Sequence, residues 1–170
     1  MQSLGYSAAN PLKVKVSTRN IPLYRDPAVI FIDQMKKIHI DGELEVVDST
    51  IWHAKVQRKD YAIGLNTTGV GVDDPDVNLV ENYTCKSDRN YTGYCNEEIT
   101  RLIDQQSQEI DPVKRRALVW QIQTRLENEA SRPIMGWRTD HFAHHPHVKG
   151  LTIHNVVYNC CRLQDTWLDR

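Results

Sequence analysis

The stretch that decides the fold is LKVKVST, residues 12–18, in which apolar side chains alternate with lysine or hydroxyl side chains. Alternation with a period of two is typical of a strand with one buried face. Asp26 and Pro27 follow, and they predict the start of a helix with Asp26 as N-cap and Pro27 in the first turn. This part of the chain is therefore predicted to be a strand followed by a helix.

The same order of elements repeats as far as residue 65. A second strand is predicted over residues 43–48 and a third over residues 60–65. A short helix is predicted between them, with Ser49 or Thr50 as its N-cap. Strand, helix, strand, helix, strand is the pattern of an α/β fold with right-handed crossovers.

The second half of the chain is predicted to be mainly helical. Residues 66–96 form a polar stretch that is long for a loop without secondary structure, and such loops are usually functional. Asp76 is the predicted N-cap of a short helix within it. Asn96 and Asp111 are predicted to cap two further helices, and residues 132–137 predict a returning strand.

Composition narrows the class of protein. The 170 residues carry 21 basic and 22 acidic side chains, a formal net charge of −1. Because nucleic-acid-binding domains usually carry a basic excess, this charge balance argues against that class. No apolar run is long enough for a membrane span, and the sequence shows no internal repeat or linker, so a single soluble domain is predicted.

The first residues predict a fragment. They lack the basic and apolar regions of a secretory signal. Leu4 and Gly5 instead predict the last turn of a helix with glycine at its C-cap. A helix that ends so early predicts either a naturally truncated start or a chain that was cut from a longer one.

Two pairs of cysteines lead to different predictions. A disulfide between Cys85 and Cys95 would close a small loop in an oxidising compartment and contribute about 2–3 kcal/mol. A metal site would need CxxC-type spacing and two further ligands, which the sequence lacks. A disulfide is therefore predicted. The adjacent Cys160 and Cys161 are predicted to be free thiols, because a vicinal pair bridges only with strain.

A group of histidines is the second candidate for metal binding. It comprises His141, His144, His145 and His147. Four imidazoles in such a short run suit Zn, Ni or Cu. The run lacks the HExxH pattern, however, and Pro146 prevents a helix through it. A solvated loop is therefore predicted, and no metal site is assigned.

The most acidic feature is GVGVDDPD, residues 69–76, which follows the predicted third strand. Sheets of α/β proteins bind ligands at the carboxyl ends of their strands. Three carboxylates would repel a phosphate, and the GxxxxGK[ST] pattern is absent. Carboxylates suit a metal ion such as Ca²⁺ or an ammonium group. The alternative without a ligand is a helix N-cap at Asp76.

The sequence contains no recognisable catalytic motif. The sequence has no GxSxG elbow, no cysteine with a catalytic signature and no paired carboxylates that could be placed. We therefore expect a protein that is not an enzyme and that needs no cofactor. Three matches to the N-glycosylation pattern, at Asn66, Asn82 and Asn90, are expected by chance in an Asn/Thr-rich stretch.

Taken in order, these motifs resemble a known family. They are Ser17-Thr18-Arg19-Asn20, Tyr24-Arg25-Asp26-Pro27, Asp60-Tyr61, Asp73-Asp74-Pro75-Asp76, Cys85 to Asn96, and Asp111-Pro112 followed by Lys114-Arg115. This order resembles the C-terminal part of the extracellular solute-binding proteins of peptide ABC transporters, whose relatives also bind nickel. The resemblance covers essentially the whole chain. It implies a periplasmic-binding-protein-like α/β lobe, with a mixed sheet flanked by helices, excised as the second lobe of a two-lobe protein. Residues from about 155 to 170 would return to the first lobe.

The resemblance also implies a binding site. It places Asp74, with Asp73 as the alternative, against the α-ammonium group of a peptide, as a charge-assisted hydrogen bond. It implies that Arg19, with Arg25 as the alternative, binds the peptide carboxylate. Trp52 would wall a side-chain pocket, although an aromatic residue in the core is the commoner arrangement.

The implied function is capture of short peptides for an ABC transporter outside the inner membrane. The alternative is a protein of the same family that binds nickel or another small solute. The implied partners are a peptide, the permease subunits and the missing N-terminal lobe, with no nucleic acid. The implied location is the bacterial periplasm, after export on a signal peptide that this fragment lacks, and it agrees with the predicted disulfide.

Overall fold

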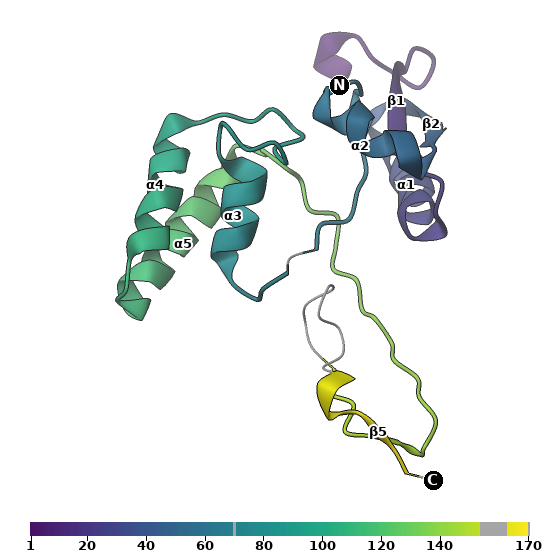
Figure 1. Ribbon diagram of the computed structural model, residues 1–170. Coiled ribbons are helices and arrows are strands. Elements are labelled where there is room, and N and C mark those ends of the chain that lie inside the picture. The colour runs from purple at the N-terminus through teal and green to yellow at the C-terminus, as the bar shows by residue number, and fades with distance from the viewer. Residues whose placement is uncertain (70, 154–162, 170) are drawn as a thin grey trace. The chain divides into compact units, whose positions relative to one another are not determined.

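The computed structural model describes residues 1–69, 71–153 and 163–169. Contacts divide the chain into two compact units, which we call unit 1 (Met1–Thr68) and unit 2 (Gly69–Arg170) and describe separately. Figure 1 shows the elements of both. The prediction that the chain forms one lobe remains a prediction.

Some predictions concern residues that the structure does not describe. They are the free thiols at Cys160 and Cys161 and most of the segment predicted to return to a first lobe. Among the described residues, no helix combines the length and the apolar character that a bilayer crossing needs.

Unit 1 is a parallel three-stranded sheet with its connecting helices. Its elements are β1 (Leu12–Arg19), α1 (Pro22–Met35), β2 (Ile40–Val47), α2 (Ser49–Gln57) and β3 (Ile63–Gly64). The strand order is β2-β1-β3, with Leu12 opposite Ile40 and Ser17 opposite Gly64. The predicted α/β class is confirmed.

The period of two in β1 decides which face of the sheet is covered. Val16 is fully buried and belongs to a cluster with Ala28 and Met35 of α1, while Lys13 and Lys15 are exposed. Alternate residues of a strand point to opposite faces, so the valines meet α1 and the lysines lie on the other face.

Two helix starts differ from the predictions. Helix α1 begins at Pro22, so Pro27 lies inside the helix. Proline is favoured at the first helical position, where its missing N–H would have no partner in any case, and Pro22 occupies that position. Helix α2 is capped by Asp48, whose Oδ1 accepts the Thr50 N–H at 2.8 Å. The predictions of Asp26 as cap, and of Ser49 or Thr50 as cap, are therefore wrong.

Within its described residues, unit 2 contains three packed α-helices, a short 3-10 helix (Leu163–Asp165) and a short antiparallel strand pair. Its elements are α3 (Pro75–Tyr83), α4 (Glu97–Gln108), α5 (Pro112–Asn128), β4 (Val148–Lys149) and β5 (Trp167–Leu168). The helices share a core that we call the three-helix core, made by Leu79, Tyr83, Ile99, Ile103, Ile122 and Leu126. This core positions two segments. The segment before α3 carries the acidic residues, and the segment before α4 carries the disulfide.

The predicted caps of α4 and α5 are confirmed. Asn96 accepts the N–H of Glu98 at 3.0 Å, and Asp111 accepts the N–H of Val113 at 2.8 Å. These side chains satisfy N–H groups that have no partner within the helix. Local sequence signals therefore located both helices correctly.

Two predictions for unit 2 are corrected. The cap of α3 is Asp74, and Asp76 lies in the first turn. Residues 132–137 contain no strand, because no strand in the described part of the chain pairs with them. The apolar side chains of Ile134 and Trp137 are 64% and 89% exposed there.

Candidate functional site

Arg19 ends β1, at the carboxyl edge of the parallel sheet in unit 1. Its Nε donates to Ser49 Oγ at 3.3 Å, and its Nη1 donates to Tyr24 Oη at 3.2 Å. The guanidinium also lies 4.9 Å from the centre of the Tyr24 ring. Among the described residues Arg19 forms no ion pair, so its positive charge has no carboxylate partner. The carboxyl edge of such a sheet is a common place for ligands.

The other two predicted residues of unit 1 have different surroundings. The Nε of Arg25 lies 3.5 Å from Asp26 Oδ1, so its charge is partly compensated. Trp52 is fully buried, and its indole N–H has no hydrogen-bond partner among the described residues. The burial of Trp52 is the arrangement expected of a core aromatic residue, and its role in a ligand pocket remains a prediction.

A second polar feature of unit 1 lies on the lysine-bearing face of the sheet. It is an open hollow of about 440 Å³, lined partly by Ser17, Glu45 and Lys55. Ser17 Oγ donates to Glu45 Oε2 at 2.5 Å, and Lys55 Nζ lies 3.3 Å from the same oxygen. The hydrogen bond from Ser17 is the main reason why the pKa of Glu45 is lowered. These groups satisfy one another, so the hollow does not present an unpaired charge at Glu45.

In unit 2, Asp74 is held by a two-pronged ion pair. The Arg115 guanidinium donates from Nη1 to Oδ2 at 2.9 Å and from Nη2 to Oδ1 at 2.6 Å. Oδ1 also accepts the Asp76 N–H at 2.9 Å, and Arg115 Nε donates to the carbonyl oxygen of Gln106 at 3.3 Å. One arginine of α5 thus joins the start of α3 to the end of α4.

This pairing changes the acid–base behaviour of both residues. The pKa of Asp74 is lowered, first by the hydrogen bond from Arg115 and then by the Asp76 N–H, while burial acts in the opposite direction. The same bond raises the pKa of Arg115. Asp74 is therefore a charged residue whose two oxygens are already occupied.

The neighbouring carboxylates differ from each other. Asp76 accepts hydrogen bonds from Gln106 Nε2 and Ser107 Oγ, and the Gln106 side chain is fully buried. Asp73 is exposed and forms no ion pair with any described residue. Of the three carboxylates in this loop, the one at Asp73 is therefore available to a ligand.

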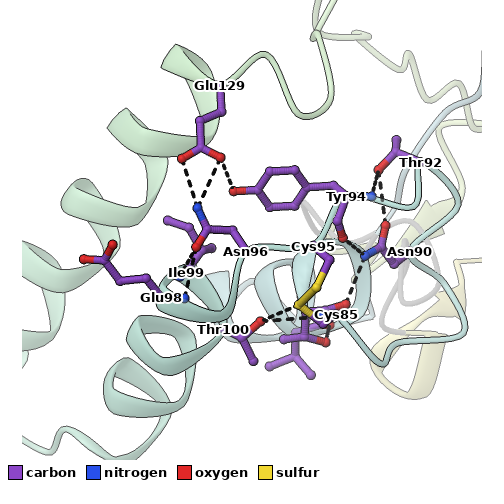
Figure 2. The surroundings of a disulfide bond; sticks show 12 residues. Cys85, Asn90, Thr92, Tyr94, Cys95, Asn96, Glu98, Ile99, Thr100 and Glu129 are labelled. Atoms are coloured by element: carbon purple, nitrogen blue, oxygen red, sulfur yellow. Dashed lines mark hydrogen bonds between the residues drawn. A yellow bond between two sulfur atoms is a disulfide. The ribbon is translucent and has the colours of Figure 1, made fainter.

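The predicted disulfide between Cys85 and Cys95 is confirmed. Figure 2 shows that Asn90 lies inside the loop that the disulfide closes. Asn90 is 4% exposed, and its Nδ2 donates to the carbonyl oxygens of Thr84 at 3.0 Å and Tyr94 at 2.6 Å. A buried asparagine thus cross-links the two sides of the loop, in addition to the covalent bond.

The end of this loop is tied to α5 through Glu129. Tyr94 Oη donates to Glu129 Oε2 at 2.7 Å, and Asn96 Nδ2 donates to Oε1 at 3.2 Å. Burial, together with Glu129, raises the pKa of Tyr94 to about 12. Tyr94 is therefore neutral at ordinary pH and acts as a hydrogen-bond donor.

The predicted histidine loop shows limited organisation. The rings of His145 and His147 stack with centroids 5.3 Å apart. Within the part of the chain that the structure describes, the histidines do not join a group of three or more potential metal ligands. The prediction that they bind no metal remains a prediction.

Sequence reasoning missed Arg115 and Gln106 as partners of the acidic loop. Arg115 lies 41 positions from Asp74. No local pattern indicates a contact over such a separation, which depends on how α5 packs against α3 and α4.

Comparison with known proteins finds similar structures but no similar sequence. No protein-family model and no curated protein matches the sequence. NikA from Staphylococcus aureus in complex with Ni(L-His)2 matches with a TM-score of 0.68 at 20% identity, over 76% of this chain and 28% of that one. OppA from Burkholderia pseudomallei matches with a TM-score of 0.68 at 21% identity, over 76% and 26%.

A third solved structure is the ABC transporter-associated periplasmic binding protein DppA from Helicobacter pylori, in complex with peptide STSA. It matches with a TM-score of 0.65 at 20% identity, over 76% of this chain and 26% of that one. The chain thus spans about a quarter of the length of these structures. At such identities the likeness establishes the fold, and this chain has the fold of part of a periplasmic binding protein.

Proposed function

We propose that this chain is part of a solute-binding protein that captures short peptides for an ABC transporter. The fold supports this, because the Helicobacter pylori protein with the same fold was solved with a bound peptide. We further propose that the whole protein is exported to the periplasm, contains a further N-terminal lobe and delivers its ligand to membrane permease subunits.

The observation that carries the proposal is the exposed carboxylate of Asp73, which forms no ion pair with a described residue. A peptide ammonium group needs a carboxylate that has no cation of its own. Asp74 is occupied by Arg115, and Asp76 accepts hydrogen bonds from Gln106 and Ser107. Asp73 is exposed beside them, so we assign the ammonium contact to Asp73 in place of Asp74.

Arg19 is the proposed contact for a ligand carboxylate. Ser49 and Tyr24 hold its guanidinium without neutralising it. Arg25 is the weaker candidate, because Asp26 already lies beside it. A planar guanidinium suits a carboxylate, which it can bind through two parallel N–H groups.

A second candidate ligand is a nickel chelate. NikA matches this chain with the same TM-score as OppA, so the fold likeness favours neither ligand over the other. A chelate whose own groups complete the metal coordination would need few ligands from this chain. A carboxylate oxygen of such a chelate that is not bound to the metal would be bound by the Arg19 guanidinium.

Calorimetry with the natural full-length protein tests the assignment of Asp73. We expect Asp73→Asn to weaken binding of a tripeptide with a free N-terminus about tenfold, which is the effect of losing a solvent-exposed charge-assisted hydrogen bond. The same tripeptide with an acetylated N-terminus lacks the ammonium charge. Its weaker binding should therefore be unchanged by the substitution.

Asp104→Asn is the matched control, because Asp104 is another exposed aspartate of unit 2. It should leave the affinity for both peptides unchanged. An equal loss of affinity for the free and the acetylated peptide in Asp73→Asn would contradict the ammonium contact. Failure of the natural protein to bind any peptide would contradict the proposed function itself.

A further inference from the structure

We infer that Cys85, Cys95 and Glu97 form a binding site for a thiophilic divalent cation when the disulfide is reduced. The two Sγ atoms and a carboxylate oxygen of Glu97 all lie within 4.8 Å of one another. Two thiolates and a carboxylate are ligands of Zn²⁺ and of the softer Cd²⁺. Because the oxidised sulfurs carry no thiolate, the disulfide and the bound metal exclude each other.

The loop has a non-covalent frame that keeps the two cysteines together after reduction. Asn90 binds the carbonyl oxygens of Thr84 and Tyr94, which are the residues directly before Cys85 and Cys95. A single buried side chain thus holds the two positions next to the cysteines. Figure 2 shows Asn90 between the two sides of the loop.

The rest of the loop is fixed independently of the sulfurs. Ser87 Oγ donates to the carbonyl oxygen of Glu81 at 2.5 Å, and Arg89 Nη1 forms an ion pair with the Glu81 carboxylate at 2.6 Å. At the other end, Asn96 binds Glu129. These contacts limit the freedom that the reduced loop gains, so the two cysteines stay close to each other.

Helix α4 provides a favourable electrostatic environment for thiolates. Cys95 directly precedes the N-cap Asn96, and Glu97 is the first residue of this 12-residue helix. The positive end of a helix dipole stabilises nearby anions. Thr100, one turn into α4, donates its hydroxyl hydrogen to Cys85 Sγ at 3.5 Å, an outer contact of the kind that orients metal ligands.

The site is also accessible. Cys95 and Glu97 are exposed, whereas Cys85 is half-buried. A reductant and a metal ion can therefore reach the sulfurs from solvent, and water can complete a tetrahedral coordination sphere.

A phosphine can reduce the Cys85–Cys95 disulfide in a reaction that conserves atoms and electrons. The phosphine gives two electrons to the S–S bond and takes the oxygen of one water molecule, becoming a phosphine oxide. The two protons of that water protonate the two sulfurs. The cation then binds both thiolates and releases these two protons to solvent.

Titration of the full chain with Cd²⁺ tests the site. Because the chain has two further cysteines, Cys160 and Cys161, both are replaced by serine in every sample. After reduction and removal of the phosphine, we expect an ultraviolet thiolate-to-cadmium charge-transfer band that saturates at one Cd²⁺ per chain. The oxidised sample should show no such band.

Substitutions distinguish the contributions of the proposed ligands to metal binding. Cys95→Ser should reduce the charge-transfer band by at least half and weaken binding more than a hundredfold. Glu97→Gln should keep the band and weaken binding about tenfold, as expected for the loss of one charged ligand. Glu98→Gln is the matched control and should bind like the parent, because Glu98 already pairs with Arg125 at 2.6 Å.

Several outcomes overturn the inference. One is a reduced chain that keeps its helical circular dichroism and shows no saturable band. Another is equal binding by Glu97→Gln and Glu98→Gln, which would remove Glu97 from the site. Loss of the helical signal on reduction would also overturn it, because the frame around Asn90 would then depend on the disulfide.

Discussion

Replacing Ile103 by alanine is expected to lower the free energy of unfolding of unit 2 by about 2–5 kcal/mol. Ile103 is fully buried in the three-helix core, where α4 packs against α3 and α5. The substitution removes buried apolar atoms and leaves a cavity that the surrounding helices fill only in part. Urea unfolding followed by circular dichroism measures the change.

Ile110→Ala is the matched control, because the same side chain is 96% exposed there. Its effect should stay within about 0.5 kcal/mol, as is usual for surface substitutions. If Ile103→Ala were no more destabilising than Ile110→Ala, the packing of α4 described here would be wrong.

Asp74→Ala is expected to lower the free energy of unfolding by about 1–3 kcal/mol. The substitution removes the N-cap of α3 and the two-pronged contact with Arg115. The ion pair is one-third exposed, so the cap supplies a large part of the effect. Asp73→Ala, one position earlier, should change stability by less than about 0.5 kcal/mol.

A double-mutant cycle with Arg115→Ala isolates the ion pair. Arg115→Ala should cost less in the Asp74→Ala background than in the parent, because the partner is already gone. Independent effects of the two substitutions would contradict the contact.

The same pair predicts a dependence on pH. The pKa of Asp74 in the folded protein is lowered from its ordinary value of 3.8. Its contribution to stability is therefore fully present above pH 3.8 and is lost as the pH falls through the lower folded value. The difference in stability between the parent and Asp74→Asn should shrink over that range. A difference that stays constant would show that the Asp74 charge does not contribute.

The sequence predicted those parts of the fold that depend on local signals. Alternation in residues 12–18 located β1, and Asn96 and Asp111 located two helices through hydrogen bonds to their own first turns. Gly5 has a φ of 83°, as predicted for a glycine at a helix C-cap. Each of these features is decided within a few residues, so the local sequence is sufficient to indicate it.

Features that depend on packing were not predictable in this way. Asp26-Pro27 carries a valid local signal for a helix start, but Pro22 provides the same signal earlier, and the helix continues through Pro27. Asp74 has the acidic character expected of a ligand contact, yet α5 brings Arg115 against it. Burial of Trp52 likewise depends on the unit as a whole.

The most direct test of the proposed function is native mass spectrometry of the natural full-length protein, purified without added ligand. Peptide capture predicts masses above that of the protein alone which, after denaturation, are released and sequenced as short peptides. Asp73→Asn should reduce their occupancy, and Asp104→Asn should not. A protein that carries only a nickel chelate, or that binds no peptide from a mixed tripeptide pool, would contradict the proposal.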